Sequence, residues 1–282
     1  MRSQWRATRV LAYLVLAVGV VLYLGPFAIQ VATSFKTDPD AVANPMSLIP
    51  RPPTLDAWRV VTGDNPAANP PILRWVGNSF LVTTSVTLGR VFLASLAGYA
   101  LARLRFPGRG AVAAGLIAVL AVPGIVLLIP KFLVLQQLGL FNTYSGMILP
   151  LFADAMSILL MKTAFEAVPW ELEEAAIIDG AGVFTRFRRV VLPLTVPALV
   201  AVVILSFQGS WNEFTHFLIA TNDPDLATLN LGIARLMAGT LGQGQQFPLK
   251  LTLATLSALP IAIVYVFASR HFTRTAATTG LK

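Results

Sequence analysis

The chain has 282 residues, of which 56% are hydrophobic and only 12% are charged, against roughly 25% charged in a soluble domain. Its mean hydropathy is +0.72 and its formal net charge is +8. This composition excludes an ordinary soluble domain and indicates an integral membrane protein. The absence of cysteine excludes disulfides and thiolate sites.

Six apolar runs follow one another along the chain, and each is long enough for the ~20 residues that cross the hydrocarbon layer as a helix. They lie near 10–33, 76–102, 111–135, 144–165, 197–220 and 249–269. The sequence therefore predicts an all-α integral membrane protein with six transmembrane helices. Proline residues inside several runs, such as Pro123 and Pro150, predict bends because each removes a backbone hydrogen bond.

Lysine and arginine are distributed unequally between the two sides that six spans create. One side, with both termini and the polar stretch near 170–190, carries thirteen of them; the other carries seven, mostly in long loops. The positive-inside rule places both termini in the cytoplasm. This bias also accounts for the net charge without nucleic acid.

Two connections on the opposite side are long. Residues 34–75 contain eight prolines, which predicts an irregular surface loop, and residues 221–248 are rich in Gly and polar residues. The second segment is adaptable and can offer hydrogen bonds, so we expect it to touch an extracytoplasmic partner.

An acidic insert interrupts the apolar pattern between the fourth and fifth runs. Pro169 can open a helix, and Glu171, Glu173 and Glu174 would lie at the positive end of its dipole. We expect this helix over about 170–179, then a turn at Gly180 and Gly182. A second, basic amphipathic helix is expected over 183–191.

Within this insert, Glu174-Ala175-Ala176 is followed after three residues by Gly180, and after nine more by an aliphatic residue, any residue and Leu192-Pro193. The pattern resembles the EAA loop of ABC-importer permeases at every position. The resemblance implies that this segment couples to an ATP-hydrolysing subunit. The residues that would do so are Glu173, Glu174, Ala175, Ala176, Asp179, Gly180, Leu192 and Pro193. An interfacial helix on the lipid headgroups is the alternative.

Further stretches resemble the MalG-like, carbohydrate-importing branch of this type I family: 97–108, 138–144, 169–174 and 211–214. The resemblance implies three parts, an N-terminal helix and loop (1–73), a permease domain (74–271) and a cytoplasmic tail (272–282). It also implies four partners in the bacterial inner membrane and on its two faces: a second permease, two ATP-binding subunits and an extracytoplasmic solute-binding protein. ATP and Mg would bind those ATPase subunits, since this chain has no phosphate-binding Gly-Lys-Ser/Thr loop.

Polar residues within the spans are candidates for the solute path. Arg90 and Asp154 fall near the middle of spans, where an isolated ion is costly, and their depths permit a direct or water-bridged contact. An aromatic residue with amides and a carboxylate also suits sugar hydroxyls. This second set is Asn78, Gln208, Trp211, Asn212 and Glu213. Helix packing is the alternative role for both sets.

The sequence thus predicts a transport subunit without catalytic, cofactor or metal residues, which moves a carbohydrate by alternating access. Glycerol 3-phosphate or another sugar phosphate is the second possibility, and it would give Arg90 a direct role. A secondary transporter would need a coupling-ion site, for which Asp154 with Arg90 is the only hint. A membrane enzyme would need a catalytic set at one depth, and none is recognisable.

Overall fold

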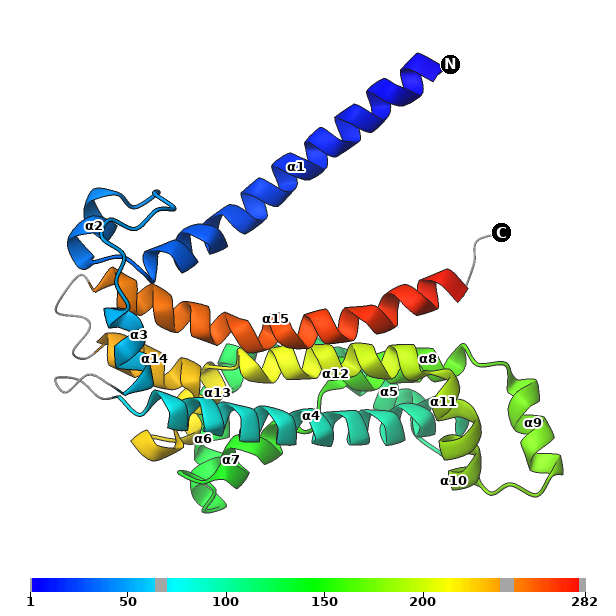
Figure 1. Cartoon of the computed structure of the whole chain (residues 1–282). Coiled ribbons are helices and arrows are strands. Elements are labelled where there is room, and N and C mark those ends of the chain that lie inside the picture. The colour runs from blue at the N-terminus through cyan, green and yellow to red at the C-terminus, as the bar shows by residue number, and fades with distance from the viewer. Residues whose placement is uncertain (1, 64–69, 239–245, 279–282) are drawn as a thin grey trace. The chain divides into compact units, whose positions relative to one another are not determined.

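A computed structural model describes residues 2–63, 70–238 and 246–278, with side chains at 9, 11–63, 70–238 and 246–267 (Figure 1). The expected partner contact falls partly on the Gly-rich stretch 239–245, which lies outside these residues. The tail end 279–282 and several terminal basic side chains that the charge distribution counts lie outside them too. Every regular element in the described ranges is helical. The described chain divides into two units, residues 1–73 with 233–259 and residues 74–232 with 260–282.

The first unit contains α1 (Arg2–Thr33), α2 (Asp38–Ala43), α3 (Asp56–Thr62) and the first part of α15 (Phe247–Thr278). Gln30 of α1 donates a hydrogen bond to Thr255 of α15 at 3.1 Å. The buried Lys36 donates to the carbonyl of Asn44 at 2.8 Å. The first contact fixes the end of α1, and the second fixes the segment that follows it.

The expectation of an irregular loop over 34–75 is wrong where α2 and α3 form. Thr37 caps α2 by accepting the Asp40 N–H, and a proline lies in the first turn. Gly63, at φ +85°, closes α3. Asp40 accepts the backbone N–H of Arg51 and the amide of Asn44, and these bonds hold the pKa of its carboxyl below the usual value. Local caps therefore overcome the proline content.

The second unit holds most of the spans that the structure describes, and among these α4 (Ile72–Arg103) runs through without a break. Three bent pairs follow it, at 98°, 42° and 82°. They are α5 (Arg109–Leu120) with η1 (Gly124–Leu127) and α6 (Leu128–Gln137); α7 (Tyr144–Ile148) and η2 (Leu149–Leu151) with α8 (Ala155–Glu166); and α10 (Val183–Arg186), η3 (Phe187–Val191) and α11 (Leu192–Leu194) with α12 (Val196–Trp211).

Three described helices are long and apolar enough to cross a membrane, and six spans result if each bent pair counts as one. The expected bends at Pro123 and Pro150 are confirmed, since the chain breaks after α5 and between η2 and α8. The fifth apolar run is not one helix, because α12 ends at Trp211 and a separate α13 (Thr215–Ala220) follows. After it come η4 (Pro224–Leu226) and α14 (Leu229–Ala238).

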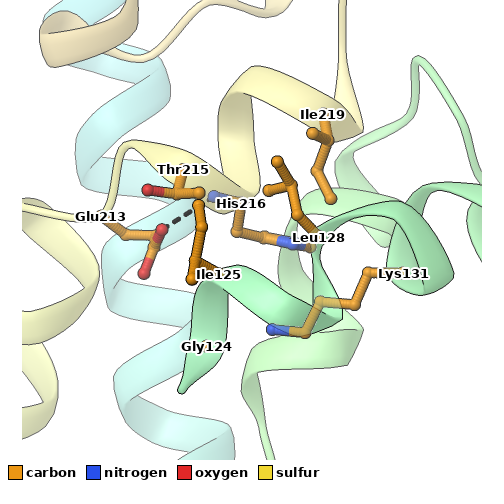
Figure 2. A pocket seen from close by; sticks show the side chains of 8 residues that line it. All are labelled: Gly124, Ile125, Leu128, Lys131, Glu213, Thr215, His216 and Ile219. Carbon is orange, nitrogen blue, oxygen red and sulfur yellow. Dashed lines mark hydrogen bonds between the residues drawn. The ribbon is translucent and has the colours of Figure 1, made fainter.

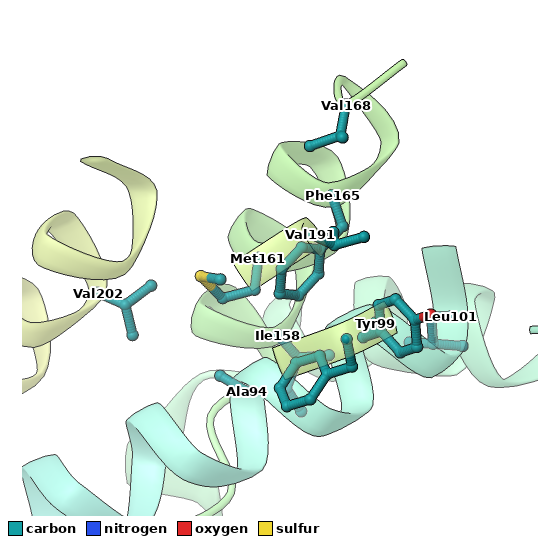
Figure 3. Close-up of a cluster of buried hydrophobic side chains, with 10 residues drawn as sticks. Ala94, Tyr99, Leu101, Ile158, Met161, Phe165, Val168, Val191 and Val202 are labelled. Carbon is teal, nitrogen blue, oxygen red and sulfur yellow. The ribbon is translucent and has the colours of Figure 1, made fainter. Parts of the chain in front are cut away.

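A hydrophobic cluster joins α4, α8, η3 and α12 inside the second unit (Figure 3). Tyr99 is at its centre, with its ring 5.9 Å from that of Phe165 and 5.1 Å from that of Phe187. Gly98 lets α4 approach α8, because a Cβ there would lie 2.9 Å from the backbone nitrogen of Lys162. The cluster positions the acidic insert that begins just beyond it. The cluster residues are Ala94, Tyr99, Leu101, Ile158, Met161, Phe165, Val168, Phe187, Val191 and Val202.

Candidate functional site

The acidic insert forms α9 (Trp170–Ile178), with Pro169 one position before the helix rather than inside it. Gly180 ends it at φ +78°, as expected, and the Ala181 N–H returns to the Ala176 carbonyl at 2.8 Å. Left-handed backbone of this kind favours glycine. Helix and turn project from the end of the second unit where α4 also ends (Figure 1).

One carboxylate of the insert faces inward. Glu173 is 1% exposed, and its Oε2 accepts the Tyr99 hydroxyl at 2.9 Å. Its two oxygens form ion pairs with Arg103 Nε at 3.2 Å and Arg186 Nε at 3.6 Å. Tyr99, Arg103, Glu173 and Arg186 are called the Glu173 cluster below. They come from α4, α9 and α10, so the cluster ties the insert to a membrane helix.

Arg103 extends this connection to the end of α8. Its Nη2 donates to the carbonyls of Phe165 and Val168, and its guanidinium carbon lies 5.6 Å from the ring centre of Trp170. Two cations surround one buried anion, so removing Glu173 would leave both arginines without their partner. Breaking a buried pair in this way costs about 3 to 5 kcal/mol.

The outer face of the insert has the opposite character. Ile178 is 86% exposed, and Leu172, Ile177, Val183 and Phe184 are also exposed large apolar side chains. Exposed apolar patches bordered by charge mark interaction surfaces. Of the residues predicted to couple, Glu174, Ala175, Asp179, Gly180 and Pro193 are exposed, Ala176 and Leu192 are partly buried, and Glu173 is buried. The insert therefore has an anchoring side and an open side.

The second helix of the insert differs from the simple amphipathic helix that its spacing predicts. It begins as α10, widens into the π-helix η3 and continues as α11. Phe187 and Val191 of η3 enter the hydrophobic cluster, while Arg188 and Arg189 stay exposed. This segment thus packs the base of the insert onto α4 and α8.

Two of the predicted solute-path residues have a packing role in the structure. Asn78, which is 6% exposed, donates to the carbonyls of Asp225 and Ala227 and accepts the Tyr144 hydroxyl at 2.7 Å. Trp211 is buried, with its ring stacked on Phe207 and edge-on to Phe80. Gln208 and Asn212 are exposed, and Glu213 is half-buried.

Arg90 and Asp154 form no ion pair within the residues that the structure describes. Arg90 Nε instead donates to the Leu151 carbonyl at 2.6 Å. Asp154 is the N-cap of α8, with Oδ2 accepting the Ser157 N–H at 2.8 Å. The direct form of the expected contact is therefore wrong, because the break before α8 gives each group a backbone partner. The water-bridged form stays a prediction.

A cavity of about 220 Å³ lies between η1, α6 and α13 (Figure 2). It is lined by Gly124, Ile125, Leu128, Lys131, Glu213, Thr215, His216 and Ile219 and is called the Lys131 cavity below. Glu213 is the only predicted site residue in its wall. Sequence reasoning missed the others because the break after α12 was not expected, and the bend expected at Pro123 does not show which segments it brings together.

Broken helices within apolar spans, together with an exposed insert anchored to a membrane helix, define a multi-pass membrane transport subunit. The family described as binding-protein-dependent transport system inner membrane component matches residues 91–277. The chain belongs to this family.

Relatives match almost the whole chain. The sn-glycerol-3-phosphate transport system permease protein UgpE of Agrobacterium fabrum is 30% identical over 94% of this chain and 95% of its own length. A putative ABC transporter permease protein, ORF2, of a Caldicellulosiruptor species is 32% identical over 90% of both chains.

Among solved structures, a bacterial ABC transporter that imports the acidic polysaccharide alginate shares the fold. Its chain aligns with a TM-score of 0.80 and 22% identity over 96% of this chain and 98% of its own. A complex of a bacterial alginate ABC transporter with its pentasaccharide-bound periplasmic protein gives 0.65 and 16%. The type I importer-permease fold predicted from the sequence is thereby confirmed.

Proposed function

We propose that this chain is the transmembrane permease subunit of an ATP-driven importer that moves a carbohydrate across the bacterial cytoplasmic membrane. The family membership and the carbohydrate-branch stretches at 97–108 and 211–214 support this assignment. A second, homologous permease would complete the solute path, and a solute-binding protein would deliver the solute. Alternating access between two orientations of the path would carry it across.

The observation that carries the coupling role is the two-sided insert. Its open side, with Ile178, Glu174 and the turn at Gly180, offers a docking surface for an ATPase subunit. Its anchoring side, the Glu173 cluster, would pass the motion of that subunit to α4. Glu173 then acts within this chain as a positioning residue, whereas the exposed motif residues make the contact. ATP and Mg would bind the ATPase subunits.

The charge bias supports a topology in which the insert and both termini lie in the cytoplasm. The segment after α13 would then face the other side, where the binding protein docks. Asp225 in this segment is tied to α4 by an ion pair with Arg74 at 2.6 Å and by the hydrogen bond that Asn78 donates to its carbonyl at 2.8 Å.

The absence of cysteine from the chain makes a direct test of docking possible. With Ile178→Cys in the complete importer, we expect a thiol-directed crosslinker to join this chain to the ATPase subunit, and ATP to change the crosslinking rate. Leu138→Cys, at an exposed position near the end of α6, is the matched control and should give no such product. An Ile178→Cys importer that assembles and hydrolyses ATP without this crosslink would contradict the docking surface.

Glycerol 3-phosphate is the second candidate solute, because relatives with that name align over nearly the whole chain. Uptake of radiolabelled maltotriose, alginate trisaccharide and glycerol 3-phosphate by proteoliposomes with the complete importer and its binding protein separates the candidates. We expect ATP-dependent uptake of an oligosaccharide. Uptake of glycerol 3-phosphate alone would select the second candidate, and uptake of none would reject both.

A further inference from the structure

The Lys131 cavity lies beside two breaks in the helices. One wall follows the break after α5, at Gly124 and Ile125, and the other follows the break after α12, at Glu213 and Thr215 (Figure 2). Non-helical backbone at membrane depth is tolerated where it is buried in protein or lines a cavity. In transporters, such broken helices form the solute site. The position of the cavity thus agrees with a solute-binding role.

The polar groups of the cavity wall are held in place, but their hydrogen-bonding capacity is not filled by one another. Glu213 Oε1 accepts the His216 N–H at 2.8 Å, and the His216 ring contacts the Gly146 carbonyl at 3.2 Å. No ion pair or hydrogen bond joins Lys131 to any residue that the structure describes, and the hydroxyl of Thr215 likewise has no such partner there. An ammonium group, a carboxylate oxygen and a hydroxyl therefore remain available to a ligand.

The charges around this cavity balance. Lys131 and Glu213 are the charged residues of its wall. One cation thus faces one carboxylate. Phosphate carries about 1.5 to 2 negative charges and is bound where arginine or lysine groups outnumber carboxylates. The balance in this region gives a phosphate no net attraction.

We propose that the Lys131 cavity is a solute subsite of this subunit and that it takes an uncharged, polyhydroxylated solute. Sugar hydroxyls can donate to the free oxygen of Glu213 and accept from Lys131, while Thr215 can do either. The volume of about 220 Å³ is below the roughly 300–1,000 Å³ of sites that enclose a whole ligand, so the cavity holds one ring or one end of an oligosaccharide. The proposal rests on the proposed importer function and favours the oligosaccharide over the sugar phosphate.

Thiol labelling tests the charge of the cavity without knowledge of the solute. In the complete importer in nanodiscs, Thr215→Cys would be treated with a neutral, a cationic and an anionic methanethiosulfonate. The labelling rate with each reagent would be divided by the rate at which the same reagent reacts with free 2-mercaptoethanol. We expect the neutral reagent to react and the cation-to-anion ratio to lie within about threefold of unity, as a balanced site requires. Leu218→Cys, on the same helix but outside the cavity wall, is the background control.

Charge variants calibrate the cation-to-anion labelling ratio. Lys131→Met should raise this ratio by about fivefold and Glu213→Gln should lower it by about fivefold, which is the effect of one unit charge at roughly 8 Å in water. Glu213→Gln keeps an amide oxygen to accept the His216 N–H, so the fold of the wall is preserved. A ratio that favours the anionic reagent more than tenfold would overturn the uncharged class. A thiol that the neutral reagent does not reach would overturn the cavity itself.

Solute protection completes the test. Maltotriose should slow the labelling of Thr215→Cys in the presence of binding protein by at least about threefold and leave Leu218→Cys unaffected, since bound solute would cover only the first. Protection by glycerol 3-phosphate or alginate trisaccharide instead would contradict the uncharged class while the importer function stands. Oligosaccharide uptake without protection would reject the subsite alone, and failure of all uptake would reject the proposed function.

Discussion

The two ends of the second unit arrange their charged side chains in opposite ways. At the end that carries the insert, Glu173 is paired directly with Arg103 and Arg186, and four side chains lock three helices together. At the other end, Lys131 and Glu213 share a cavity without pairing. Direct pairing consumes the charges and makes a rigid joint. Balance without pairing leaves polar groups that a solute can use.

The largest effect is expected from breaking the joint. Glu173→Ala removes the buried carboxylate that pairs with two largely covered arginines, so the free energy of unfolding should fall by about 3 to 5 kcal/mol. Thermal unfolding of the purified importer measures this change. Glu171→Ala is the matched control, because Glu171 is an exposed carboxylate of the same helix and should change stability by no more than about 0.5 kcal/mol. Equal losses for both variants would show that the Glu173 cluster is not a joint.

The next variant tests whether Asn78, at the far end of α4, packs or binds solute. Asn78→Ala leaves the carbonyls of Asp225 and Ala227 without their donor, at a cost of about 1 to 3 kcal/mol. We expect lower thermal stability with an unchanged KM for the transported solute. A raised KM at unchanged stability would return Asn78 to the solute path.

A smaller effect is expected at the turn of the insert. Gly180→Ala forces a side chain into left-handed backbone and should cost about 1 to 2 kcal/mol, whereas Gly182→Ala, at φ −68°, has no such strain. Neither added Cβ meets another atom within 4 Å. Gly180→Asp should in addition stop uptake while the subunit still inserts and assembles, because its charge stands on the proposed docking surface. Parental uptake by this variant would contradict the docking role.

The smallest effect concerns the break before α8. Asp154→Asn can still accept the Ser157 N–H and should be nearly neutral, whereas Asp154→Ala loses the cap and should cost about 1 kcal/mol. This order differs from the one that a buried ion pair with Arg90 would produce, in which Asn is already severe. Measuring both variants by thermal unfolding therefore distinguishes a helix cap from a charge partner.

Much of the fold could be read from the sequence because lipid imposes a simple rule of length and polarity. The apolar runs, the bends at Pro123 and Pro150 and the exit at Gly180 follow from that rule and from local backbone chemistry. Pro260 stays inside the unbroken α15. The insert was recognisable from its spacing. The helices α2 and α3 were missed because capping by Thr37 and Gly63 outweighs a high proline content.

The contacts of the candidate site could not be predicted in the same way. Tyr99 and Arg103 stand in the stretch 97–108 that carried the family resemblance, but nothing local shows that they meet Glu173, some 70 residues further on. The same holds for Lys131 and Glu213, which line one cavity only because the helices break after α5 and after α12. Contacts between distant segments depend on packing, and a single sequence records packing only indirectly.

Because α4 is unbroken, the number of its residues sets how its two ends are rotated relative to each other. Its 32 residues span about 48 Å, with Asn78 fixed to the segment after α13 near one end and Tyr99 and Arg103 fixed to α9 near the other. Inserting or deleting one residue between these points would turn one set by about 100° around the helix axis relative to the other. Substitutions along the lipid-facing side leave this phase intact. The number of residues between Asn78 and Tyr99 is therefore more strictly constrained than the identity of those intervening residues.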